Sequence, residues 1–287
     1  MAKNNKRIAQ KIIIIFVTIA TVFVFDFWLF SPKDLSKKEV VPAETNQTEK
    51  INTNQSIPEQ SKIVNKETQP LVEENKIIPE TREIKSSVNL SVPFVSQAPF
   101  GKWDDLHNEA CEETALIMAK YWLNNQKLSL AAADQEILSS VSWQMDNFGG
   151  HYDLNSENII KMAQQYFGIE KIYFTSIKNI DDIKYQLSQG NLVIVPTAGR
   201  LLENKYFKNP GPVYHMLVVK GYNDKEIITN DPGTKRGENF SYSYDNFWDS
   251  IHDWPFALGE KENLSKDEKA VEILNGQKAM IVIEKNN

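Results

Sequence analysis

The chain has 287 residues, of which 41% are hydrophobic and 24% are charged, as in an ordinary globular protein. Its formal net charge is −6 and its sequence pI is about 5.4. No cluster of Lys and Arg lies beyond the N-terminus and no nucleotide-binding motif is present, so we expect neither nucleic acid nor a nucleotide as a partner.

The N-terminus has the pattern of a membrane anchor. Residues 1–11 form a short basic tail, and residues 12–30 are an almost wholly apolar run, long enough to span a bilayer as a helix. Because basic residues precede this run, we expect an uncleaved signal anchor in the cell membrane, a single pass with its N-terminus in the cytoplasm. A cleaved signal peptide that releases a secreted protein is the alternative.

Residues 31–87 have the composition of a disordered linker. They contain no Phe, Trp, Tyr or Gly, and they are rich in Glu, Lys, Asn, Gln and Thr. Such a segment buries too little apolar surface to offset its loss of conformational entropy. We therefore expect residues 88–287 to form the folded domain, outside the cytoplasm.

The domain begins with a short predicted strand at 92–95 and a loop at 97–101. A helix is expected from Asn108, a good N-cap residue, to Asn124. Further helices are expected at 129–140, 155–167, 180–189 and 244–252, and strands at 192–196, 213–222, 226–231 and 278–284. Helices that precede most of the strands predict an α+β domain rather than an alternating parallel sheet.

Cys111 is the only cysteine, and it lies where the first long helix is expected to start. A helix start lowers the pKa of a thiol, and the thiolate is the nucleophilic form. Nearby Glu109, Glu112 and Glu113 act in the opposite direction, although acidic residues also suit a helix N-terminus. Outside the cytoplasm an unpaired cysteine indicates a reactive thiol or an intermolecular disulfide.

A nucleophilic thiol needs a base and a group that orients the base. If residues 223–225 form a three-residue hairpin loop, His215 lies opposite Gly233 and diagonal to Asp231 on one face of the sheet. A two-residue loop would place the two side chains on opposite faces. The hairpin can therefore hold Asp231 beside the imidazole of His215.

Gln97 precedes Cys111 by 14 residues and is a candidate oxyanion donor. The backbone N–H of Cys111 is a second candidate, since N–H groups in the first helical turn lack intrahelical partners. Taken singly, each of these residues has an ordinary structural interpretation, and only their joint occurrence favours catalysis.

Two other histidines compete with this set. His107 and Cys111 are spaced as metal ligands on one helix face, but further ligands are missing, so we expect no metal and no cofactor. His151 is a rival base for which the sequence offers no orienting group.

Four segments, in order, resemble the double-glycine (bacteriocin-processing) peptidase-like family, which is family thirty-nine of the cysteine peptidases, in the papain-like superfamily. They are Val92–Gly101, Asn108–Glu113, Tyr214–Tyr222 and Asn230–Gly233, and the resemblance covers roughly residues 90–255. It implies a papain-like fold in which a helix carrying the thiol packs on an antiparallel sheet. It also implies that Cys111 is the nucleophile, His215 the base, Asp231 its orienter and Gln97 the oxyanion donor.

The sequence thus predicts a membrane-anchored, extracytoplasmic cysteine peptidase or amide hydrolase that acts on a peptide or protein substrate. Two alternatives stay open. One is a catalytically inactive peptide-binding module of the same fold. The other is a thiol-dependent acyl transferase or cell-wall amidase, because hydrolysis and transfer share a thioester intermediate.

Overall fold

The computed structural model describes residues 82–285, so the expected tail, anchor and most of the linker lie outside the described residues. Within 82–285, no helix is both long enough and apolar enough to cross a bilayer. The elements are β1 (Val88–Asn89), α2 (Asp105–Asn108), α3 (Cys111–Leu123), α4 (Leu130–Phe148), α5 (Ser156–Gln165), β2 (Ile172–Ser176), α6 (Ile180–Ser188), β3 (Leu192–Ala198), η1 (Gly199–Leu202), β4 (Tyr214–Tyr222), β5 (Glu226–Asn230), β6 (Phe240–Ser243), α7 (Tyr244–Ser250), α8 (Lys266–Glu272), η2 (Ile273–Asn275) and β7 (Ala279–Ile283).

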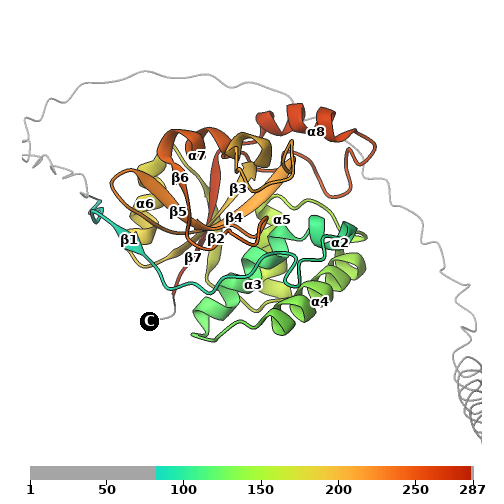
Figure 1. The fold of residues 1–287 in the computed structure, drawn as a ribbon, viewed down its shortest axis with the longest axis horizontal. Coiled ribbons are helices and arrows are strands. Elements are labelled where there is room, and N and C mark those ends of the chain that lie inside the picture. Colours follow the sequence, from blue (N-terminus) through green and yellow to red (C-terminus); the bar gives the residue numbers. More distant parts are fainter. Residues whose placement is uncertain (1–81, 286–287) are drawn as a thin grey trace, which may run out of the picture. The chain divides into compact units, whose positions relative to one another are not determined.

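The strands form one antiparallel sheet in the order β2-β7-β3-β4-β5-β6, with β1 added beside β4 (Figure 1). Strands β3 and β4 lie at its centre, and every residue of both is buried. The expected α+β class with an antiparallel sheet is confirmed.

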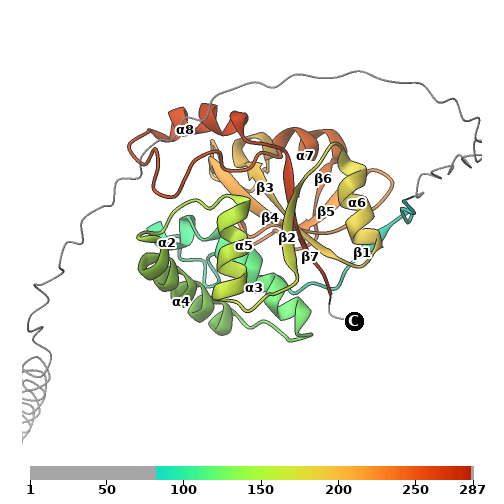
Figure 2. The same ribbon diagram turned by 180° about the vertical axis from the view of Figure 1, so that it is seen from behind.

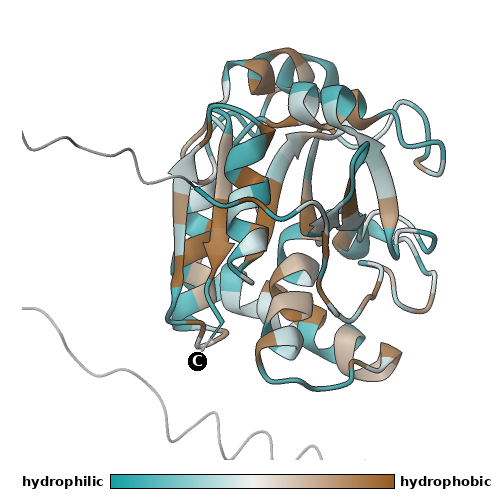
Figure 3. Cartoon of the chain, turned by 90° about the vertical axis from the view of Figure 1, so that its left-hand side faces the viewer, coloured by the Kyte–Doolittle hydropathy of each residue, from teal (hydrophilic) through white to brown (hydrophobic). Residues whose placement is uncertain are grey.

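Helices cover both faces of this sheet (Figures 1 and 2). One core lies between the sheet and α3, α4 and α5, and it contains Met216 and Val218 of β4. The other core lies between the sheet and α6 and α7, and it contains Leu217 and Val219. Alternate residues of β4 therefore enter different cores, as the two-residue period of a strand requires. Figure 3 shows the apolar residues concentrated along the strands and polar residues on the surrounding loops.

The β4–β5 hairpin reaches the predicted register by a different route. Tyr222 pairs with Ile227, not with Glu226, so the prediction of a three-residue loop was wrong by one residue. A β-bulge between Val219 and Gly221 then absorbs the extra residue, and Val218 pairs with Asn230 as predicted. The bulge thus restores the register that brings His215 and Asp231 together.

The helix that carries Cys111 starts later than predicted. Its N-cap is Ala110, which makes no side-chain capping bond, and Cys111 is its first residue. Asn108, the predicted cap, is the last residue of α2, and its side chain binds the carbonyl of Trp103 at 3.3 Å. The tertiary contacts of the 103–110 segment override the intrinsic preference of Asn for a cap.

The other predicted helices and strands of the domain are confirmed to within a few residues, apart from the helix expected at 129–140, which extends to Phe148. The strand expected at 92–95 does not form, and β1, β2, β6 and α8 were not predicted. Residues 82–87, the end of the expected linker, contact the domain. Arg82 forms an ion pair with Asp182 at 2.8 Å, and the N–H of Lys85 donates to Ser188 Oγ at 3.0 Å.

Candidate active site

His215 and Asp231 form the centre of the site. His215 Nε2 lies 2.7 Å from Asp231 Oδ1, and both side chains are buried. The imidazole comes from the start of β4, and the carboxyl group follows the end of β5. The sequence-based prediction that the hairpin joins these two side chains is confirmed.

Asp231 is held by more donors than the sequence indicated. Its Oδ2 accepts hydrogen bonds from Asn204 Nδ2 at 2.8 Å and from the Tyr242 hydroxyl at 2.6 Å. Its Oδ1 also accepts from the N–H of Gly233 at 2.9 Å. Burial acts to raise the pKa of Asp231, but His215 and these hydrogen bonds outweigh burial and lower the pKa overall.

This arrangement fixes the tautomer of His215. An ionised Asp231 can only accept hydrogen bonds, so Nε2 of His215 must carry the proton that it shares with Oδ1. In the neutral imidazole, Nδ1 is then an unprotonated base. Among residues 82–285, no hydrogen bond to this Nδ1 is found.

The imidazole is packed tightly from two sides. Phe207 meets it edge-on with ring centroids 5.2 Å apart. A Cβ atom at Gly233 would lie only 2.8 Å from Cε1 of His215, so this position favours glycine. The loop around Gly233 therefore fixes the plane of the imidazole.

Cys111 lies in the same core as Met216 of β4, the residue that follows His215. The Met216 backbone acts to lower the pKa of the thiol. The thiol lies 3.0 Å from Oε2 of Glu112, to which it donates. The thiol thus lies on the side of β4 that faces α3, and its proton points to a carboxyl group.

Cys111 and His215 come from different sides of the sheet. Cys111 belongs to the core between the sheet and α3. His215 is two residues from Leu217 and four from Val219, so its side chain lies on the same face of β4 as theirs, toward the opposite core. Cys111 is only 4% exposed and His215 only 1%, so a substrate must displace part of the surface to reach them.

The expectation that the helix start lowers the thiol pKa was wrong. Burial, followed by the nearby Glu112, raises the pKa of Cys111 well above its ordinary value. The N-terminus of one helix contributes only a partial charge, which the loss of solvent and an adjacent carboxyl group outweigh.

Gln97 lies between the two halves of the site. Its N–H donates to Pro232 O at 2.9 Å, next to Asp231. Its side-chain amide donates to the carbonyls of His107 at 2.8 Å and Asn108 at 2.9 Å, while its buried Oε1 has no partner among the described residues. An oxyanion role would therefore require the amide to turn away from these carbonyls.

The two remaining candidate histidines have carboxylate partners of their own. His107 Nδ1 lies 2.6 Å from Asp104, and its Nε2 lies 3.2 Å from Asp134, so its ring joins α2 to α4. His151 Nε2 lies 3.3 Å from Oε1 of Glu113. The sequence-based statement that nothing orients His151 was therefore wrong.

Residues 89–255, more than half of the chain, match the model of the Peptidase_C39 like family. The chain belongs to the Peptidase_C39 like family. A crystal structure described as a C39-like peptidase from Bacillus anthracis is 16% identical, with a TM-score of 0.43, over 71% of this chain and 100% of that chain. No curated protein matches the chain.

In this C39-like protein, acidic groups surround the start of α3: Glu112 and Glu113 are buried, and Asp153 is half-buried. Burial, followed by Asp153 and Glu113, raises the pKa of Glu112 well above its ordinary value. Burial, followed by Glu109, raises the pKa of Asp153 from 3.8 to about 7. Burial acts to lower the pKa of His151, but Glu113 raises it overall.

These shifts predict that the protein is more stable in mild acid than at alkaline pH. The folded state holds the proton of Asp153 more tightly than the unfolded state between about pH 4 and about pH 7, so stability falls as pH rises through this window. We expect the Tm to be higher at about pH 5 than at about pH 8 by about 5 °C or more. Asp153→Asn should remove much of this difference in Tm. The matched control Asp146→Asn, at an exposed position, should leave the difference unchanged. A thermal scan in which the Tm rises with pH would contradict this expectation.

Helix α8 connects the two sides of the site. Lys266 forms an ion pair at 3.2 Å with Glu109, which lies two residues before Cys111. Asp267 forms an ion pair at 2.8 Å with Arg200. The preceding residue, Gly199, packs against His215 so closely that a Cβ atom at this position would lie 3.0 Å from Cβ of His215. No residue of α8 is buried, and Figures 1 and 2 show it at the margin of the domain.

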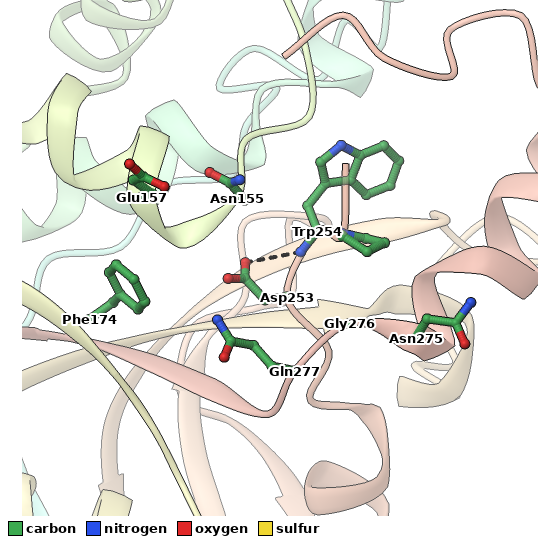
Figure 4. Close-up of a pocket in the computed structure, with 9 residues that line it drawn as sticks. Asn155, Glu157, Phe174, Asp253, Trp254, Asn275, Gly276 and Gln277 are labelled. Atoms are coloured by element: carbon green, nitrogen blue, oxygen red, sulfur yellow. Dashed lines mark hydrogen bonds between the residues drawn. The ribbon is translucent and has the colours of Figure 1, made fainter. Parts of the chain in front are cut away.

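Two surface cavities lie near these elements. One, of about 340 Å³, is lined by residues 199–211 and includes Asn204 and Phe207, which contact Asp231 and His215. The other, of about 290 Å³, lies between the start of α5 and the 253–255 segment (Figure 4). There Asp253 accepts from the N–H groups of Trp254 and Ser156, both at 2.9 Å, so its carboxyl group fixes the backbone. Neither cavity is lined by Cys111 or His215.

Proposed function

We propose that the chain is a cysteine peptidase, or a related amide hydrolase, with a papain-like arrangement in which Cys111 is the nucleophile, His215 the base and Asp231 its orienter. The observation that carries the proposal is the buried pair of His215 and Asp231, with Nε2 of the imidazole 2.7 Å from Oδ1 of the carboxyl group and with His215 on β4, the strand whose Met216 shares a core with Cys111. Family membership supports the same chemistry.

In this mechanism, Nδ1 of His215 takes the proton of the thiol, and the sulfur attacks the substrate carbonyl carbon. The N–H of Cys111, for which no hydrogen bond is found among the described residues, donates to the oxyanion, and Gln97 is the second donor once its amide turns. His215 then protonates the leaving amine, and it activates the water that hydrolyses the thioester. Neither a metal nor another cofactor is part of this mechanism.

The location of the enzyme is part of the proposal. Residues 12–30 would anchor it in the cell membrane, and residues 31–81 would hold the domain outside the cytoplasm. Peptides or proteins at that surface are the proposed substrates.

The nearly complete burial of Cys111 and the raised pKa of its thiol favour one alternative, a binding module without turnover. The test is incubation of the full chain with a peptide library, with Cys111→Ala as the control. Peptide cleavage together with a Cys111-dependent acyl-enzyme mass supports the peptidase. Transfer of the acyl group to an added amine identifies an acyl transferase, and the absence of both contradicts thiol chemistry.

A further inference from the structure

Glu112 is the group closest to the sulfur that the proposed mechanism does not use. Its Oε2 lies 3.0 Å from Sγ of Cys111, and its Oε1 accepts the N–H of Leu154 at 3.1 Å. The side chain is only 1% exposed. The second hydrogen bond therefore holds the carboxyl group in an orientation that keeps one oxygen against the sulfur.

The groups that face Glu112 come from three elements. Glu113 follows it on α3, Asp153 lies on the loop before α5, and Tyr214 lies on β4. His151, whose Nε2 lies 3.3 Å from Oε1 of Glu113, is a group beside this cluster that can carry a positive charge. Burial and the two neighbouring carboxyl groups raise the pKa of Glu112, so it keeps its proton at pH values where a free Glu is ionised.

The two protonation states of Glu112 have opposite effects on the sulfur. A neutral carboxyl group can donate its O–H to a thiolate and stabilise it. An ionised carboxylate can only accept the S–H, and it repels a thiolate. The contact at 3.0 Å is close enough for either interaction.

We propose that Glu112 is a positioning residue that controls whether Cys111 can become a thiolate. Neutral Glu112 donates a hydrogen bond to the sulfur, and the proton of the thiol passes to Nδ1 of His215 while Glu112 keeps its own. Ionised Glu112 holds the sulfur as a thiol. The meaning of this control for catalysis rests on the proposed function, but the control itself is measurable without a substrate.

The test is the rate of alkylation of Cys111 by iodoacetamide in the full chain, from about pH 5 to about pH 9, in the wild type and in Glu112→Gln. Gln fits the site, because its Oε1 can accept from Leu154 while its Nε2 donates to the sulfur at every pH. Above the pH at which Glu112 ionises, we expect Glu112→Gln to react about tenfold faster than the wild type, as for a thiol pKa lower by about one unit. At lower pH the two rates should converge.

The matched control is Glu157→Gln, which makes the same change of charge at an exposed position of α5 and should follow the wild type. The wild-type profile also gives a test without any variant, because it should contain two ionisations rather than one. Identical profiles for the wild type and Glu112→Gln, or a single ionisation in the wild type, would overturn the inference. If the profiles differ as expected but no peptide is cleaved, the proposed function fails and the role of Glu112 stands.

Discussion

Replacing Cys111 with Ala or His215 with Gln is expected to lower amide hydrolysis by about 10³-fold or more. The two residues act as one unit, so the double variant should be little worse than either single variant. The measurement is kcat/KM on a peptide that the wild-type chain cleaves, with circular dichroism to establish that each variant is folded.

The matched controls use the other histidines. His252→Gln makes the same substitution at a ring that binds the carbonyl of Gly276, and it should retain activity. His151→Gln tests the rival base beside Glu113. Loss of activity in His151→Gln, with activity kept in His215→Gln, would assign the base to His151 and contradict the proposed triad.

Asp231→Ala is expected to destabilise the domain by about 3–5 kcal/mol, because it leaves the buried donors on His215, Asn204, Tyr242 and Gly233 without the acceptor that they share. For a domain of this size, that loss corresponds to a decrease in Tm of about 10 °C. Thermal unfolding at neutral pH measures it. The stabilisation by Asp231 is present above its unfolded pKa and is lost as pH falls through its lowered folded pKa, so the difference between the variant and the wild type should shrink in strong acid.

A graded series separates the contributions at Asp231. Tyr242→Phe removes one donor to Asp231 and the hydroxyl that accepts from Asn204, and it should cost about 1–2 kcal/mol. Asp231→Asn keeps the shape but removes the charge, so it should retain more stability than Asp231→Ala while losing most of the activity, since the amide no longer fixes the tautomer of His215. An Asp231→Ala variant with the melting temperature of the wild type would contradict the hydrogen-bond network described above.

The elements predicted correctly from sequence are those with strong local patterns. The hairpin of β4 and β5 combines two apolar runs with a turn signal, and its register placed His215 beside Asp231 even though the loop differs by one residue. The β-bulge explains why the register is as predicted although the loop is one residue longer than predicted. Long, regular strands are fixed by burial of alternate residues, which tolerates a local change at the turn.

The parts that were missed depend on distant contacts or weak signals. Asn204 and Tyr242 bind Asp231 from segments far apart in the sequence, and nothing in their local sequence indicates this. Helix α8 has no apolar face, but its capping box, Ser265 with Glu268, was a usable signal. The raised pKa of Cys111 could not be derived from the helix start alone, because it depends on how deeply the fold buries the thiol.

The two ion pairs of α8 have a practical consequence for every measurement on the thiol. Solvent-exposed ion pairs contribute at most about 1 kcal/mol each, and added salt screens them. One pair ends at Glu109, two residues before Cys111, and the other at Arg200, next to the Gly199 that packs against His215. The ionic strength of the buffer therefore acts on the surroundings of both residues at once. We thus expect the reaction rates of the thiol to depend on salt concentration, and they should be compared only at constant ionic strength.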